Sequence, residues 1–99
     1  MKKTLSQLKK DLHKGVKLEC LEHSVKSDYV GLIREVNITQ TNAFTLLTEK
    51  NGAMVDSWLW YPKASMIDYE DDVFTVYEDF SQYGGNARQL LYSYKILNN

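Results

Sequence analysis

The chain is poor in cysteine, proline and long apolar runs. Its single cysteine, Cys20, cannot form an internal disulfide and gives no metal-binding framework by itself, so we interpret it as a small buried hydrophobe. No apolar run approaches the roughly 18 residues that span a bilayer, and the N-terminus MKKTLSQLKKDL lacks the continuous apolar stretch of a secretory signal. We therefore expect one folded domain, residues 1–99, in the cytoplasm.

Neither sign of charge dominates the composition, because the formal net charge is only −1. The charges are nevertheless unevenly distributed. Residues 1–26 contain seven lysines and three acidic residues, which gives a net charge of +4, whereas residues 66–80 contain six acidic residues and no lysine or arginine, which gives −6. Such asymmetry steers encounters with charged partners.

The N-terminal residues 1–15 carry the one helical pattern of the chain. Leu5, Leu8 and Leu12 recur at the i, i+3, i+7 spacing of one helical face. Thr4 precedes them as an N-cap, and Gly15 follows as a C-terminal stop. The pattern predicts a helix from Leu5 to Lys14.

After Gly15 the period changes from 3.6 to 2, which predicts strands over residues 16–78. VKLECLEH (16–23) alternates apolar and polar residues, and YVGLIREVNITQ (29–40) is long enough to bend at Gly31. Asn51-Gly52 between AFTLLTE and AMVDSWLWY predicts a tight hairpin, and Asp71-Asp72 predicts a second one. Residues 79–89 have no periodicity and predict a loop, before a last strand over 90–97.

These elements predict a mainly β fold with a short N-terminal helix, in the α+β class. Short strands with turns every eight to twelve residues are typical of a small curved antiparallel sheet or a barrel, SH3-like or OB-like.

The sequence contains no pattern that we can assign to catalysis. Cys20 and His23 are three residues apart, a spacing that points them to opposite faces of a strand. Asp71 and Asp72 are explained by turn chemistry, and the Gly84-Gly85 segment lacks the following helix of a phosphate-binding loop. We predict that the protein is not an enzyme and needs no metal or cofactor.

Aromatic and acidic residues concentrate in the second half of the chain and predict a surface for a protein partner. Large rings provide contact area at low entropic cost, and carboxylates complement a basic partner. SWLWYP (57–62) holds both tryptophans, of which Trp58 is predicted to lie in the core. The predicted acidic surface is Asp68, Glu70, Asp71, Asp72, Glu78 and Asp79, and the predicted aromatic rim is Trp60, Tyr61, Tyr69 and Tyr77.

Two alternatives remain open. Small barrels that bind nucleic acid combine aromatic rings with a basic groove, and the basic residues available for this are Lys2, Lys3, Lys9, Lys10, Lys14, Arg34 and Lys63. The second alternative is a structural or assembly protein of a virion, in which edge strands mediate self-association or a homodimer.

The segments ITQTNAFTLL (38–47), SWLWYPKAS (57–65) and DDVFTVYE (71–78) resemble small uncharacterised proteins encoded by bacteriophages and mobile elements of Gram-positive bacteria. The resemblance covers residues 14–78 and implies no catalytic residues. It implies a bacterial host cytoplasm and an accessory protein that docks on a host protein. The most specific expectation is an inhibitor of a host defence or nucleic-acid-handling protein such as a nuclease, similar to anti-CRISPR proteins.

Overall fold

The computed structural model describes residues 2–79 and 88–97, and its helix α1 (Leu5–Asp11) begins where the sequence predicts. The hydroxyl oxygen of Thr4 accepts a hydrogen bond from the N–H of Gln7 at 3.1 Å, which confirms the N-cap. The helix ends at Asp11 rather than at Lys14, because Leu12 leaves the helical conformation while its side chain stays in the core. No helix among the described residues is long and apolar enough to cross a membrane.

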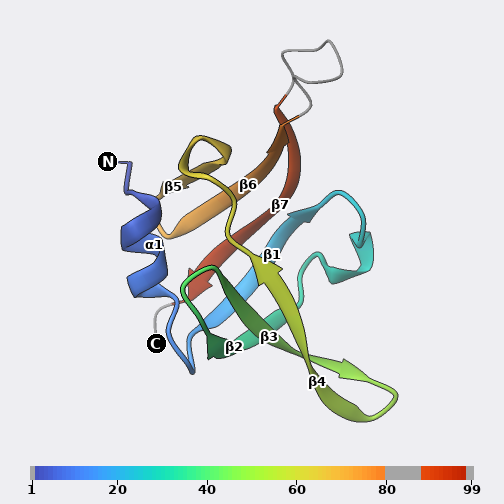
Figure 1. The fold of residues 1–99 in the computed structure, drawn as a ribbon. Coiled ribbons are helices and arrows are strands. Elements are labelled where there is room, and N and C mark those ends of the chain that lie inside the picture. Colours follow the sequence, from blue (N-terminus) through green and yellow to red (C-terminus); the bar gives the residue numbers. More distant parts are fainter. Residues whose placement is uncertain (1, 80–87, 98–99) are drawn as a thin grey trace.

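The described residues form one antiparallel sheet of seven strands in the order β4-β3-β2-β1-β7-β6-β5 (Figure 1). They are β1 (Lys17–His23), β2 (Ile33–Thr39), β3 (Ala43–Lys50), β4 (Ala53–Trp60), β5 (Ile67–Glu70), β6 (Val73–Asp79) and β7 (Arg88–Leu97). The mainly β fold with one short N-terminal helix is thereby confirmed. The strand order leaves β4 and β5 as the two edges, so the hydrogen bonding of the described residues is that of an open, curved sheet.

In the described part of the chain, two short 3-10 helices lie between strands. The first, η1 (Ser27–Tyr29), and a turn at Gly31 with φ +88 replace the start of the strand expected over 29–40, so β2 begins only at Ile33. The second, η2 (Ala64–Met66), links β4 to β5. The loop expected over 79–89 lies mostly outside the described residues, but β6 reaches Asp79 and β7 begins at Arg88.

Both predicted hairpins are present. Asn51 and Gly52 have φ +53 and +80, and Asp71 and Asp72 have φ +50 and +63. Positive φ at both central residues is the requirement of a type I′ turn, whose twist matches that of the flanking strands. The Asn51-Gly52 turn joins β3 to β4 in a long hairpin whose tip extends away from the rest of the sheet (Figure 1).

The core lies between the inner face of the sheet and α1. Leu8 and Leu12 are buried against strand residues that include Leu18, Phe44 and Tyr94. Cys20 is a free, buried thiol in this cluster, as predicted. Burial of this apolar surface is the main favourable contribution to folding, and it fixes which side chains remain on the outside.

Candidate partner-binding site

Strand β4 carries two exposed tryptophans. Leu59 pairs with the buried Phe44 of β3 and packs against the core. Since successive side chains of a strand alternate between faces, Trp58 and Trp60 lie on the opposite face. Trp58 is 44% exposed and Trp60 is 66% exposed. The prediction that Trp58 lies in the core was therefore wrong, and Leu59 occupies the inward position.

The two indoles lie beside the smallest side chains of β3. Trp58 pairs with Thr45 and Trp60 with Ala43, and both partners are fully buried. The indole rings are stacked, with 6.2 Å between ring centroids and 25° between ring planes. The tryptophans thus cover the outer face of β3 and present large ring areas to solvent.

A pocket of about 590 Å³ opens beside the tryptophans, and we call it the tryptophan pocket. It brings together β4, η2, β6, β7 and the end of β1, because the curvature of the sheet turns its distant strands toward one another. Most of its walls are apolar or aromatic, and they include Trp58, Trp60, Met66, Tyr77, Leu91 and Tyr92. This volume accommodates one large side chain or a short peptide segment.

His23 is a half-buried wall of the tryptophan pocket. Its Nδ1 accepts the backbone N–H of Lys26 at 3.0 Å and that of Val25 at 3.3 Å. Its ring stacks on Tyr92 at 5.8 Å and meets the edge of Tyr29 at 5.6 Å. Burial, followed by repulsion from Arg34, lowers the pKa of His23 below its usual value. The imidazole is therefore neutral at pH 7 and serves as an acceptor.

The aromatic wall around the pocket is uncharged as well. Burial raises the pKa of Tyr92 above its usual value. Burial also raises the pKa of the neighbouring Tyr61 to about 12. The fixed charges that line the pocket are those of Lys63 and Glu78, which are both exposed. The site has the character of a small protein-interface hot spot, with an apolar centre and a charged rim.

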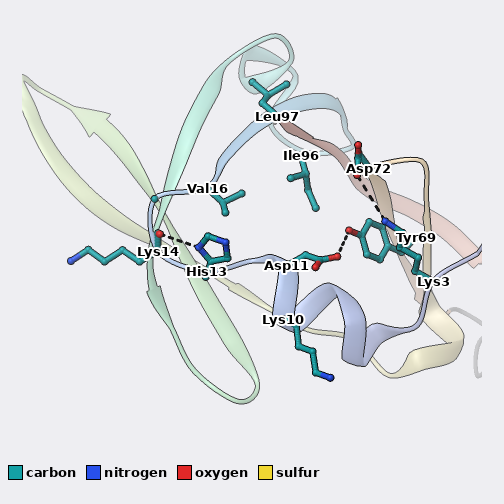
Figure 2. Close-up of a pocket in the computed structure, with 11 residues that line it drawn as sticks. Lys3, Lys10, Asp11, His13, Lys14, Val16, Tyr69, Asp72, Ile96 and Leu97 are labelled. Atoms are coloured by element: carbon teal, nitrogen blue, oxygen red, sulfur yellow. Dashed lines mark hydrogen bonds and ion pairs between the residues drawn. The ribbon is translucent and has the colours of Figure 1, made fainter. Parts of the chain in front are cut away.

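A second pocket, also of about 590 Å³, lies between α1 and the β5–β6 turn (Figure 2). Several of its polar groups bind one another. The hydroxyl of Tyr69 donates to Asp11 Oδ2 at 2.6 Å, and Lys3 Nζ lies 4.0 Å from Asp72 Oδ1. The Tyr69 hydrogen bond lowers the pKa of Asp11. These contacts attach the helix to the sheet, so this pocket has a structural explanation.

The predicted acidic surface is partly neutralised within the protein. Lys2 Nζ lies 3.3 Å from Asp68 Oδ1, in addition to the contact between Lys3 and Asp72. Lysines of the basic N-terminus and carboxylates of the acidic segment thus contact each other within the protein. Glu70, Asp71 and Glu78 are exposed, whereas the side chain of Asp79 lies outside the description of the structure.

Only some residues of the predicted aromatic rim are exposed. Trp60 is exposed, and Tyr77 is half-buried in the tryptophan pocket. Tyr61 is half-buried between Phe44, at 5.3 Å, and Lys9 Nζ, which lies 5.3 Å from the tyrosine ring centroid. Tyr69 is only 2% exposed, so its predicted place on the rim was wrong. It belongs to the core because its ring lies under α1 and its hydroxyl binds Asp11.

Arg34 was predicted among the surface cations, and the structure corrects this. It is 8% exposed on β2, donates to Thr48 Oγ1 at 3.0 Å and to the Tyr94 hydroxyl at 2.6 Å, and its guanidinium lies 4.4 Å from the Tyr29 ring centroid. Its inward position follows strand parity, since Val36 two residues later is also buried. The predicted lysines remain at least partly accessible. Lys3, Lys10 and Lys14 line the second pocket, which also contains the carboxylates of Asp11 and Asp72, whereas Lys63 lines the tryptophan pocket.

Sequence reasoning missed the participation of His23, Met66, Leu91 and Tyr92 in the tryptophan pocket. These residues come from segments far apart in the chain, and only the curvature of the sheet brings them together. Searches against protein-family models, curated proteins and solved structures found no match to the chain. Function is therefore inferred from the site itself.

Proposed function

We propose that the protein acts without catalysis, by binding another protein at the tryptophan pocket. The observation that carries this proposal is the apolar pocket of about 590 Å³ beside two exposed, stacked tryptophans. Aromatic residues around an apolar centre are the side chains that contribute most to protein interfaces. We expect a partner to insert one large apolar or aromatic side chain there.

The acidic residues outside the pocket favour a partner with a basic surface. The pocket itself is lined by Lys63 and Glu78, whereas Glu70 and Asp71 are exposed at the β5–β6 turn, at the other end of β6. An inhibitor of a basic, nucleic-acid-handling host protein fits this arrangement, so the anti-CRISPR-like function stays a prediction. Direct nucleic-acid binding is less favoured, because Arg34 is buried and Lys2 and Lys3 contact acidic residues.

The proposal is tested by capture from a bacterial lysate on immobilised protein, followed by identification of what is retained. Met66→Lys places a charge in the pocket wall, and we expect it to release a specifically captured protein because a desolvated ammonium is costly. The matched control is Ile33→Lys, since Ile33 is an exposed apolar residue of β2 that does not line this pocket. Equal retention by the two variants would contradict the proposal.

A binding assay with nucleic acid tests the alternative function. Binding of a fluorescent single-stranded oligonucleotide is measured at low and at high salt, because phosphate contacts weaken steeply with salt concentration. We expect no salt-sensitive binding. Strong binding that is lost when Lys10 and Lys14 are changed to Gln would favour the nucleic-acid function instead.

A further inference from the structure

The two edges of the sheet differ in how they are protected. β5 is only four residues long, and the backbone N–H of Lys3 donates to the Tyr69 carbonyl at 2.8 Å, so the N-terminal segment covers this edge. β4 is eight residues long, pairs with β3 along its whole length without a register shift, and has no Lys, Arg or Pro. Natural sheets protect open edges with short strands, lysines, prolines or bulges. Within the described residues, β4 has none of these, and its one charged residue, Asp56, is bound by Asn37 and Thr45 of its own sheet.

The hydrogen-bonding groups on the open side of β4 can be assigned. The N–H of Tyr61 donates to the carbonyl of Asn42 at 2.9 Å, which places the backbone groups of odd-numbered residues toward β3. Because these directions alternate along an antiparallel strand, the N–H and C=O groups of the even-numbered residues point to the open edge. These residues are Met54, Asp56, Trp58 and Trp60.

We propose that β4 pairs with β4 of a second copy of the chain, in an antiparallel register centred on Ser57. A two-fold axis perpendicular to the sheet keeps each residue on its own face, so only registers that pair even with even residues are allowed. The register centred on Asp56 would place two carboxylates directly opposite each other, which is destabilising. The register centred on Trp58 would bring Met54 opposite Pro62, which has no N–H.

The register centred on Ser57 is self-complementary. All four outward-facing residues then form hydrogen-bonded pairs, namely Met54 with Trp60 and Asp56 with Trp58, each twice by symmetry. On the other face Val55 pairs with Leu59, which is an apolar contact. The Asp56 carboxylate is already satisfied, because Oδ1 accepts bonds from Asn37 Nδ2 and from Thr45 Oγ1, both at 2.9 Å.

The size of this interface predicts a reversible dimer. Trp60, Met54 and Trp58 expose 66%, 61% and 44% of their surfaces. With about 200 Å² for a large side chain, these three side chains expose about 340 Å² together, well below the roughly 800 Å² per partner of a standard complex and in the range of weak, transient contacts. The net charge of −1 adds little repulsion between copies. We expect dissociation in the micromolar range.

Sedimentation equilibrium over about 1 µM to 1 mM protein tests the dimer, a range that brackets micromolar dissociation constants. We expect a reversible shift from monomer to dimer, and a tenfold or greater weakening in Met54→Lys, because lysine at an edge opposes strand pairing. Ile33→Lys is the matched control, since Ile33 is 56% exposed but lies on an inner strand. A monomer throughout, or equal weakening in both variants, would overturn the proposal.

The register has its own test. Ser57 faces its own copy in a non-hydrogen-bonded pair, where Cα atoms are about 4.5 Å apart, within disulfide range. Ser57→Cys should therefore give a disulfide-linked dimer under mild oxidation, whereas Ser65→Cys, an exposed position in η2, should not. The native Cys20 is buried and does not interfere. A dimer that does not crosslink through residue 57 would refute the register.

Discussion

At the scale of single residues, burial decides the role of a charged or polar side chain more than its type does. In the sequence, Arg34 is a charged residue among the apolar positions of a strand. Its guanidinium is nevertheless enclosed by Thr48, Tyr94 and Tyr29. Its Nε has no hydrogen-bond partner. Among the described residues no carboxylate forms an ion pair with it. Composition could not reveal this, because Thr48, Tyr94 and Tyr29 come from three other segments.

The residue-scale prediction concerns how protonation of His23 changes the stability of the protein with pH. The folded-state pKa of His23 lies below its usual value of 6.5, so the unfolded chain binds the proton first as pH falls. The stability contributed by the neutral ring is complete above pH 6.5 and is lost as pH falls from there through the lowered folded pKa. We expect the melting temperature to fall between pH 7.5 and pH 5.5.

His23→Gln should reduce this pH dependence, because glutamine does not titrate. His13→Gln is the matched control, because the His13 ring is exposed and its Nδ1 lies 3.3 Å from the carbonyl oxygen of Lys14. Thermal unfolding of the three proteins in the same buffers checks this. If the pH dependence of the melting temperature persists in His23→Gln and disappears in His13→Gln, its assignment to His23 is wrong.

At the scale of elements, the sequence predicted most accurately the caps and turns that depend on interactions between neighbouring residues. The N-cap at Thr4 and the turns at Asn51-Gly52 and Asp71-Asp72 depend on a few neighbouring residues, and all three were predicted correctly. The start of β2 was missed, because Tyr29 belongs to η1 and a turn at Gly31 follows before the strand begins at Ile33. The exposure of Trp58 was missed because the parity of β4 is set by its pairing with β3, where Leu59 meets Phe44.

The element-scale prediction concerns the β3–β4 turn. Gly52 has φ +80, a conformation that strains any side chain, although no atom lies within 4 Å of an added Cβ. Gly52→Ala should therefore lower the free energy of unfolding by about 1 kcal/mol through backbone strain alone. Asn51→Gly, at φ +53, should change it by less than about 0.5 kcal/mol, because glycine tolerates this conformation. Urea unfolding of both variants checks this, and an equal loss in both would contradict it.

At the scale of the whole molecule, the charge asymmetry of the sequence acts largely within the fold. The lysines near the N-terminus contact acidic residues of β5 and the following turn, and they help to cover that edge of the sheet. The opposite edge keeps an apolar surface with both tryptophans. The sequence predicted that an aromatic surface exists, but its position required the strand order.

The central claim is that a protein partner binds at the tryptophan pocket, and calorimetric titration with the purified captured protein tests it most directly. We predict that Met66→Lys weakens binding at least tenfold, which corresponds to about 1.4 kcal/mol, whereas Ile33→Lys leaves the dissociation constant within about twofold of the wild type. Unchanged affinity in Met66→Lys, with a folded protein by circular dichroism, would contradict the claim.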